Sequence, residues 1–466
     1  MSATSPIDQA ALRQLGDHFG EHVVTPADPR YDEARRVWNG RFDRSPGAIA
    51  RCRKSADVVA AVKIARGAGL KVAVRSGGHD YAGNSVCDGG LVIDLSAINS
   101  VAVDPEAKTV RAGAGARWAA IDAATQPFGL ATVGGTVSTV GVAGFTLGGG
   151  SGWLSRKHGL ALDQLVSAEV VTASGDLLRV NDHEHADLFW GLRGGSGNLG
   201  VVTEFELRLH EAGPRLYAGQ VLHPFDAAGS VLRHFRAFMS EAPDQVQCYA
   251  FLIRIPPLDV FPSEFHGRVA LDLVVAYAGD IDHGRRVLAP LTEHGTPFLS
   301  AVAPIEYTAL QQSFDAGVAP GLRWYSKAHD LRELSDAAID AILRHTENLP
   351  GPFTMVYLER IGGAVGRVPA GATAYPHRSA PWSIHILPGW SDAGQDAEII
   401  AWARAFHADL IPHATGGVYV NLLGGDEDEG PRSAYGSNYQ RLAALKRLWD
   451  PDNLFSGNHN VEPAAE

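Results

Sequence analysis

The amino-acid sequence predicts an α+β fold with two domains, the second built on a largely antiparallel sheet flanked by helices. The chain of 466 residues is about three times the usual length of ~150 residues for one domain. Glycine-rich turns between apolar segments are concentrated before Pro214, and the glycine density then falls until the C-terminus is reached. We therefore expect one domain at residues 1–214, a second at 215–410 and a C-terminal segment at 411–466.

The first domain is expected to contain a strand, a glycine-rich turn and a second strand within residues 71–96. Apolar residues alternate at 71–74 and 91–95, as in half-buried strands, and a helix is expected before them at 57–66. Glycines in the turn accept positive φ and leave backbone amides exposed, so that successive N–H groups can surround an anion such as a diphosphate. His79 would stand beside that ligand.

The side chains around His79 favour a binding role for this turn. A histidine in a loop is more often a hydrogen-bonded structural residue than a functional one. However, Arg75, Ser76, Asn84 and Ser85 place a cation and three small hydrogen-bonding side chains in the same turn. This polarity exceeds what a connection between two strands requires.

A second glycine-rich stretch, residues 134–154, also predicts contact with a ligand. No stable helix or strand interior is expected there, because each glycine costs roughly 0.5–1 kcal/mol relative to alanine. A flexible linker is the alternative, but linkers of this kind are polar. Here Val140, Phe145, Leu147 and Trp153 require burial, which favours the ligand-binding interpretation.

The run Gly195-Ser196-Gly197-Asn198-Leu199-Gly200 has the glycine spacing of a dinucleotide-binding turn but not its structural context. A helix is expected before it at 187–192 and a strand after it at 201–209. A Rossmann turn needs the strand first and the helix second, so that the helix N-terminus meets the pyrophosphate. The run therefore does not predict a nicotinamide-cofactor site.

The second domain is expected to alternate strands and helices, as in an α+β domain with an antiparallel sheet. The expected strands are 248–254, 269–277, 354–360 and 382–387, and the expected helices are 331–346 and 396–408. Its aromatic residues suit many ligands and indicate no particular substrate; they are Trp324, Tyr325, Tyr357 and Trp382.

Composition argues against several classes of partner. The 40 Lys and Arg residues against 52 Asp and Glu give a net charge of −12, whereas nucleic-acid binding needs a basic face. Cys52, Cys87 and Cys248 lack the spacing of a metal site, so we expect no metal and free thiols in a reducing cytoplasm. Neither a signal peptide nor a membrane-spanning apolar run is expected from the sequence.

The stretch Arg75-Ser76-Gly77-Gly78-His79, followed by Tyr81, Gly83, Asn84 and Ser85, resembles the flavin-attachment signature of the berberine-bridge-enzyme-like FAD-linked oxidases. The resemblance implies a PCMH-type FAD-binding fold, in which the second domain covers the flavin and the C-terminal segment returns to the first domain. It also implies a covalent bond between the ring of His79 and the 8α-methyl group of FAD. A neutral imidazole would act as the nucleophile, and the glycines would keep the wall thin enough for it to reach.

The resemblance assigns cofactor-binding roles to residues in all the glycine-rich segments and in the C-terminal segment. These residues are Arg75, Ser76, Gly77, Gly78, His79, Gly83, Asn84, Ser85, Gly135, Val140, Gly141, Gly144, Gly148, Gly149, Gly150, Gly152, Gly197, Asn198, Gly200, Val202, Asn421, Asn458 and Asn460.

Two positions bear on how the flavin is held and reoxidised. Relatives with a second flavin bond carry a cysteine where this chain has Val137, so a single link through His79 is implied and Cys87 is interpreted as a buried small residue. Val140 matches the position at which oxygen-reactive members carry a small side chain. This match implies an oxidase that releases hydrogen peroxide, with ordinary packing as the alternative interpretation.

The sequence leaves the catalytic base open. Alcohol- and sugar-oxidising relatives often carry a tyrosine at the end of a Tyr-x-Asn-Tyr pattern, but here the pattern is Tyr419-Val420-Asn421-Leu422. The remaining candidates are Tyr435, Tyr419, His385 and Glu359, with His385 slightly ahead, and each could instead be a hydrogen-bonded structural residue. The missing tyrosine keeps amine oxidation open beside alcohol oxidation.

The resemblance thus implies an FAD-dependent oxidase that takes hydride from a C–OH or C–N carbon of a small organic molecule. A secondary-metabolite alcohol, a sugar or a cyclic amine would be the substrate, and O2 would receive the electrons. One alternative is a dehydrogenase of the same fold with another electron acceptor, and the other is a non-catalytic small-molecule-binding relative. The sequence does not indicate the oligomeric state.

Overall fold

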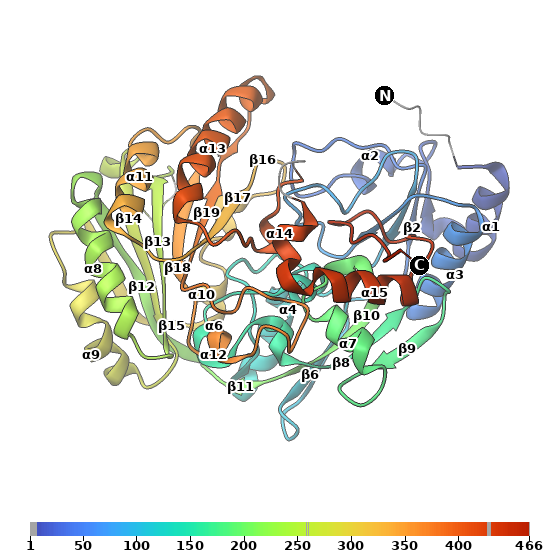
Figure 1. The fold of residues 1–466 in the computed structure, drawn as a ribbon, viewed down its shortest axis with the longest axis horizontal. Coiled ribbons are helices and arrows are strands. Elements are labelled where there is room, and N and C mark those ends of the chain that lie inside the picture. Colours follow the sequence, from blue (N-terminus) through green and yellow to red (C-terminus); the bar gives the residue numbers. More distant parts are fainter. Residues whose placement is uncertain (1–6, 258, 260, 426–429, 466) are drawn as a thin grey trace.

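Two sheets form the N-terminal part of the computed structural model, which describes residues 7–257, 259, 261–425 and 430–465 (Figure 1). The first sheet has the strand order β1 (Val23–Val24), β2 (Ala48–Arg51), β4 (Leu91–Asp94) and β3 (Val72–Arg75). Strand β4 runs parallel to both β2 and β3, and helix α3 (Ser55–Gly67) connects β2 to β3. Helix α1 (Gln9–Phe19) packs against α3.

The second N-terminal sheet is antiparallel and has five strands. Their order is β5 (Val101–Asp104), β6 (Thr109–Gly113), β10 (Val201–Arg208), β8 (Leu165–Val171) and β9 (Leu177–Val180). The helices between these strands are α4 (Trp118–Thr125), α5 (Val142–Gly148), α6 (Ser155–His158) and α7 (Ala186–Leu192).

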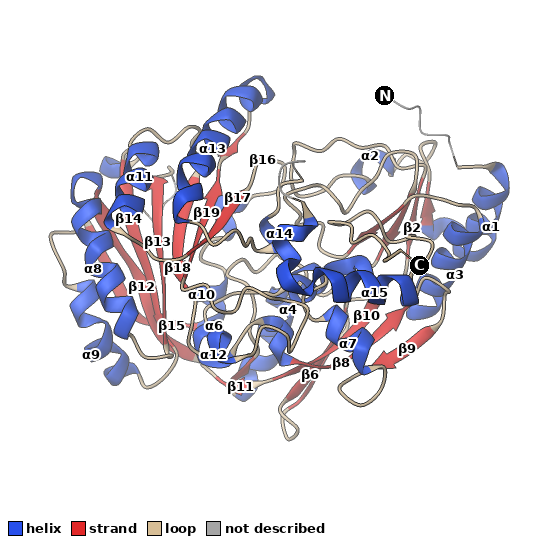
Figure 2. Cartoon of the chain, viewed as in Figure 1, coloured by secondary structure: helices blue, strands red, loops and turns tan. Residues whose placement is uncertain are grey.

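A seven-stranded antiparallel sheet forms the other half of the molecule (Figure 2). Its order is β15 (Leu299–Glu306), β12 (Arg215–Pro224), β14 (Val269–Tyr277), β13 (Val246–Arg254), β18 (Met355–Arg360), β19 (Trp382–Leu387) and β17 (Lys327–Leu331). Four helices cover one face: α8 (Ala228–Glu241), α9 (Ile281–Thr292), α11 (Asp336–Thr346) and α13 (Asp396–Leu410). The fold is therefore the α+β arrangement expected from the sequence, although the domain boundaries themselves stay a prediction.

The alternation of side chains along this sheet separates two apolar cores. On β13, Cys248, Ala250 and Leu252 pack beneath the four helices, whereas Tyr249 and Phe251 pack on the opposite face, together with Trp153 of the N-terminal half. Because successive residues of a strand point to opposite faces, this one strand supplies both cores. The opposite face is the one available to a site between the two halves.

The C-terminal segment returns to the N-terminal half, where α15 (Tyr439–Trp449) packs against α7 (Figure 1). Lys446 of α15 is fully buried; its Nζ lies 2.6 Å from Asp450 and donates to the carbonyl oxygens of Asn198 and Phe455. The short remaining elements are α2 (Tyr31–Ala34), β7 (Leu130–Ala131), β11 (His210–Glu211), α10 (Tyr307–Gln311), β16 (Arg323–Trp324), α12 (Ala364–Arg367), β20 (Gly389–Trp390) and α14 (Pro431–Tyr435).

Two secondary-structure predictions were wrong. The glycine-rich stretch contains a helix, α5, because its apolar residues Val142, Ala143 and Leu147 are buried in the main core and tertiary packing outweighs helix propensity. The helix expected at 331–346 begins only at Asp336, with Ser335 as its N-cap, and Leu331 instead ends strand β17.

Candidate active site

A cavity of about 330 Å³ lies between the N-terminal half and the seven-stranded sheet. Four stretches of the chain line it from the N-terminal side: the turn after β3, the glycine-rich stretch around α5, the start of β10 and the C-terminal segment. The sheet contributes Tyr249 and Phe251 from β13 and Met355, Tyr357 and Glu359 from β18. Of the four aromatic residues noted in the sequence, Tyr357 lines the cavity, and Trp324, Tyr325 and Trp382 do not.

Glycines let two backbone segments meet at the cavity wall. A Cβ added to Gly77 would lie 2.6 Å from the backbone nitrogen of Gly141, a separation that no side chain tolerates. Gly78 has φ of 65°, in the left-handed region that glycine adopts without strain. The wall beside His79 therefore consists of bare backbone on both segments.

His79 is half-buried, and one nitrogen of its imidazole, Nε2, is buried and unpaired. Among the described residues, no partner hydrogen-bonds its Nε2, and the ring stacks on Trp38 with 3.9 Å between centroids. Burial lowers the pKa of His79 to about 3, helped by the charge of Arg117. At neutral pH this ring is therefore uncharged, which is the nucleophilic form.

The structure brings together most of the residues to which the sequence assigned cofactor binding. Those that line the cavity are Ser76, Gly77, Gly78, His79, Asn84, Ser85, Gly135, Val140, Gly141, Gly144, Gly197, Gly200, Val202, Asn421 and Asn458. Those that do not line it are Arg75, Gly83, Gly148, Gly149, Gly150, Gly152, Asn198 and Asn460.

Several residues outside the lining support it from behind. Arg75 is buried and pairs with Asp94 at 2.7 Å, which fixes the end of β3. A Cβ on Gly148 would collide with Oδ1 of Asn421, which itself lines the cavity. The side chain of Asn198 donates to the Gly195 carbonyl oxygen and thereby shapes the 195–200 turn.

The four candidate catalytic side chains fall into two groups. Glu359 and Tyr419 line the cavity, whereas His385 and Tyr435 do not. His385 lies behind Glu359, with its Nε2 at 3.2 Å from Oε1, and stacks on Tyr357. The hydroxyl of Tyr435 is buried against the 195–200 turn, where it accepts a hydrogen bond from Asn198.

Tyr419 is arranged as a hydrogen-bond donor. Its hydroxyl oxygen accepts from the backbone nitrogen of Gly150 at 2.7 Å and from Nδ2 of Asn421 at 2.8 Å. Burial raises the pKa of Tyr419 to about 12. The hydroxyl therefore keeps its proton at neutral pH, and this proton is left to donate to another group.

Glu359 lies between the main cavity and a second, smaller one of about 20 Å³. Its Oε2 accepts from Ser151 at 3.0 Å, and Ser151 and Tyr419 also line both spaces. The smaller cavity adds His385 and the buried carboxyl of Asp330, and it has room for one water molecule. Glu359 thus borders a second polar space, whose lining also includes Arg156 and Arg360.

Sequence reasoning missed Trp38, Ser151 and the aromatic residues of β13. Trp38 precedes His79 by 41 positions and carries no motif, so no local signal could have found it. The alternation of Tyr249 and Phe251 with buried aliphatic residues on β13 was available in the sequence, but it does not say which face meets a ligand.

Comparison with known proteins defines the class. Residues 46–181 match the family model described as FAD binding domain, and residues 418–462 match the one described as berberine and berberine like. These matches and the fold define an FAD-linked oxidoreductase. The chain belongs to the berberine-bridge-enzyme-like family of these enzymes.

Similar proteins span nearly the whole chain. (R)-6-hydroxynicotine oxidase from Paenarthrobacter nicotinovorans is 31% identical over 95% of this chain and 96% of its own. Glucooligosaccharide oxidase from Sarocladium strictum is 27% identical over 93% and 91%. A crystal structure of 6-hydroxy-D-nicotine oxidase from Arthrobacter nicotinovorans superposes with a TM-score of 0.85 at 28% identity, covering 95% of this chain and 98% of that one.

The residues of the cavity fit an FAD molecule. Its wall offers backbone amides without side chains, an unpaired buried imidazole nitrogen and apolar side chains such as Val72, Val74 and Leu147. Val137 lines the cavity and has no nucleophilic atom, while Cys87 is buried outside it. Within the described part of the chain, no cluster of three or more metal-binding side chains occurs and no helix is long and apolar enough to cross a membrane.

Proposed function

We propose that the protein is an oxidase whose FAD is bonded to His79 and which removes hydride from a C–N or C–OH carbon of a small organic molecule. The observation that carries this proposal is the arrangement of the cavity, with a neutral, unpaired imidazole on its backbone wall and one carboxylate on the sheet side. Bound FAD supplies the hydride acceptor and passes the electrons to O2.

The N-terminal residues would hold the cofactor. The backbone of Gly77 and Gly78, which lines the cavity, suits the diphosphate, and Nε2 of His79 suits a bond to the 8α-methyl carbon. A single bond is proposed because Val137 offers no thiol and Cys87 lies outside the cavity. The three free, buried cysteines fit a reducing compartment, and we propose the cytoplasm.

Glu359 is the group best placed to take a proton from the substrate. Glu359 and Tyr419 are the candidates that border both the cavity and the smaller polar space, and a pKa of about 12 keeps the proton on Tyr419. His385 would act through Glu359 by holding its carboxylate, and Tyr419 would orient the substrate by donating its hydroxyl proton. The position of Tyr435 supports a structural role for that residue.

The charge of the lining favours an amine as the substrate. Glu359 lines the sheet side of the cavity, and no lysine or arginine lines this cavity within the described part of the chain. Asp80 also lines it, but in the turn proposed for FAD, where it accepts from the backbone nitrogens of Ala82 and Asn84. Tyr249, Phe251, Phe314 and Tyr357 add flat apolar surfaces, which suit a ring beside a cationic nitrogen. A cyclic amine therefore fits this cavity better than a sugar, and Val140 in the lining leaves room for O2.

The test mixes the protein with a panel of cyclic amines, alcohols and sugars without air, and then measures peroxide in air. A substrate should bleach the yellow colour and release peroxide, and Glu359→Gln should slow bleaching by about a hundredfold or more. Glu306→Gln, an exposed change on the same sheet, is the control. Colour that no compound bleaches would contradict the proposal, and bleaching without peroxide would indicate a dehydrogenase.

A further inference from the structure

We propose that Trp38 is a positioning residue that holds the imidazole of His79 for covalent attachment of FAD. We also propose that residues 318–324, between β15 and β17, hold Trp38 in place. The inference rests on the proposed bond between His79 and the flavin. It concerns a residue of the loop before β2, which does not line the cavity and is distant in the sequence from the glycine-rich segments that form its wall.

Trp38 contacts His79 through both its ring and its backbone. The two rings stack with 3.9 Å between centroids and 19° between planes. The backbone nitrogen of Trp38 donates to the carbonyl oxygen of Gly78 at 3.1 Å. Since Gly78 immediately precedes His79, these contacts fix both the base of the side chain and the plane of its ring.

Residues 318–324 keep Trp38 itself in place. Its indole nitrogen donates to the carbonyl oxygen of Val318 at 2.7 Å, and its own carbonyl oxygen accepts from the nitrogen of Gly321 at 2.9 Å. The ring of Trp324 is nearly parallel to that of Trp38, with centroids 5.4 Å apart. Trp38 is only 5% exposed, so this support is sheltered from water.

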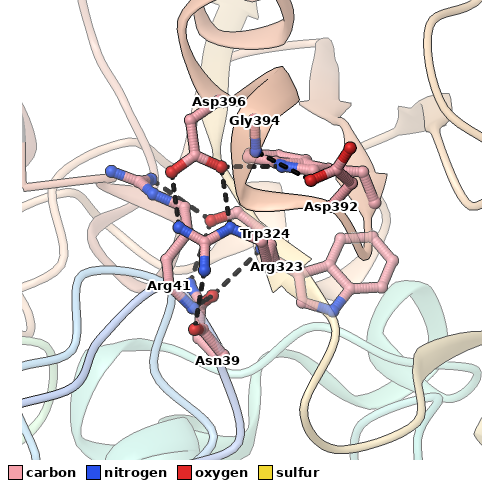
Figure 3. Close-up of polar contacts among 9 residues, drawn as sticks. Asn39, Arg41, Arg323, Trp324, Asp392, Gly394 and Asp396 are labelled. Atoms are coloured by element: carbon pink, nitrogen blue, oxygen red, sulfur yellow. Dashed lines mark hydrogen bonds and ion pairs between the residues drawn. The ribbon is translucent and has the colours of Figure 1, made fainter.

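The neighbouring polar contacts extend this support to helix α13 (Figure 3). Asn39 donates to the carbonyl oxygen of Trp324 and accepts from its nitrogen, both at 3.0 Å. Arg323 donates to Asp396, the first residue of α13, at 2.7 Å, and also to the carbonyl oxygen of Gly40. The loop that carries Trp38 is thus fixed to residues 323–324 and, through Arg323, to helix α13.

The attachment step requires a fixed imidazole. A bond forms between a ring nitrogen of His79 and the 8α-methyl carbon, one methyl C–H bond breaks, and the methyl and imidazole protons leave. The electron pair remains on the isoalloxazine, which is then two electrons reduced until O2 reoxidises it. Because bond formation depends on the direction of the nitrogen lone pair, a flat surface that prevents ring rotation should increase its rate.

The experiment follows covalent flavin incorporation by fluorescence on denaturing gels, after FAD is added to full-length protein produced in riboflavin-starved cells. Trp38→Leu removes the flat surface and should slow incorporation by about tenfold to a hundredfold. Trp38→Phe keeps a ring and should remain within a few-fold of the unmodified protein. Trp382→Leu, at a tryptophan buried to a similar degree elsewhere, is the control.

The outcomes separate this inference from the proposed function. If the unmodified protein binds FAD but never bonds it, the His79 link itself fails. If the link forms and Trp38→Leu incorporates FAD at the unmodified rate, the positioning role is overturned. Melting curves and the affinity for non-covalent FAD check folding; if the leucine variant does not fold, Trp38→Met is compared with Trp38→Phe, and equal rates contradict the inference.

Discussion

At the scale of single residues, the site depends on what burial does to a few ionisable groups. Desolvation keeps His79 neutral and Tyr419 protonated, so the first is left as a nucleophile and the second as a donor. Glu359 differs from both because it offers a carboxyl group at the cavity, where it accepts from Ser151 and lies 3.2 Å from the ring nitrogen of His385. The surroundings of these three side chains therefore determine which proton-transfer or bonding role each can take.

The neutral state of His79 predicts how flavin attachment responds to pH. Its pKa is lowered from 6.5 to about 3, so the ring takes up no proton between pH 8 and pH 5 in the folded protein. The initial rate of covalent incorporation, measured on denaturing gels across this range, should therefore not decline through loss of neutral imidazole. A decline with a midpoint near the ordinary histidine pKa of about 6.5 would contradict this account.

At the scale of elements, two glycines of the short helix α5, Gly144 and Gly148, serve different purposes. Gly144 lines the cavity, and a Cβ there would meet no atom within 4 Å. Gly148, four residues later and on nearly the same face of the helix, lies against the side chain of Asn421. One glycine leaves room for a ligand, and the other leaves room for the C-terminal segment.

These two glycines provide a matched pair of substitutions. Gly144→Ala should leave the melting temperature unchanged or slightly higher, because alanine favours a helix by about 0.5–1 kcal/mol, but it should weaken FAD binding. Gly148→Ala should lower the melting temperature because Asn421 has to move. Melting curves and FAD titrations of both variants check this, and equal effects of the two changes on stability would contradict it.

At the scale of the whole molecule, the sequence predicted those turns and strands whose structure depends on residues close together in the chain. The β3 turn, the strands β14 and β19 and the reversed order around residues 195–200 could be read from glycines and apolar alternation. Trp38 and the position of His385 behind Glu359 could not, because they depend on how distant strands and loops come together. The helix α5 escaped prediction because its stability comes from tertiary packing, which outweighs its glycine content.

The buried ion pair between Lys446 and Asp450 provides a test of how the C-terminal segment is fixed. Lys446→Met should reduce the free energy of unfolding by about 3–5 kcal/mol, because it leaves the carboxylate of Asp450 buried without its cation. Denaturant unfolding measures this effect. Lys446→Met combined with Asp450→Asn should recover part of the loss, and a double variant less stable than the single one would contradict the explanation.

The central claim, that His79 carries the flavin, is tested most directly by acid precipitation of the purified protein followed by intact-mass measurement. We expect that the yellow colour stays with the precipitate, that the mass exceeds the polypeptide by one FAD, and that both features disappear in His79→Ala. Colour released into the acid supernatant by the unmodified protein, or a flavin adduct that persists in His79→Ala, would contradict it.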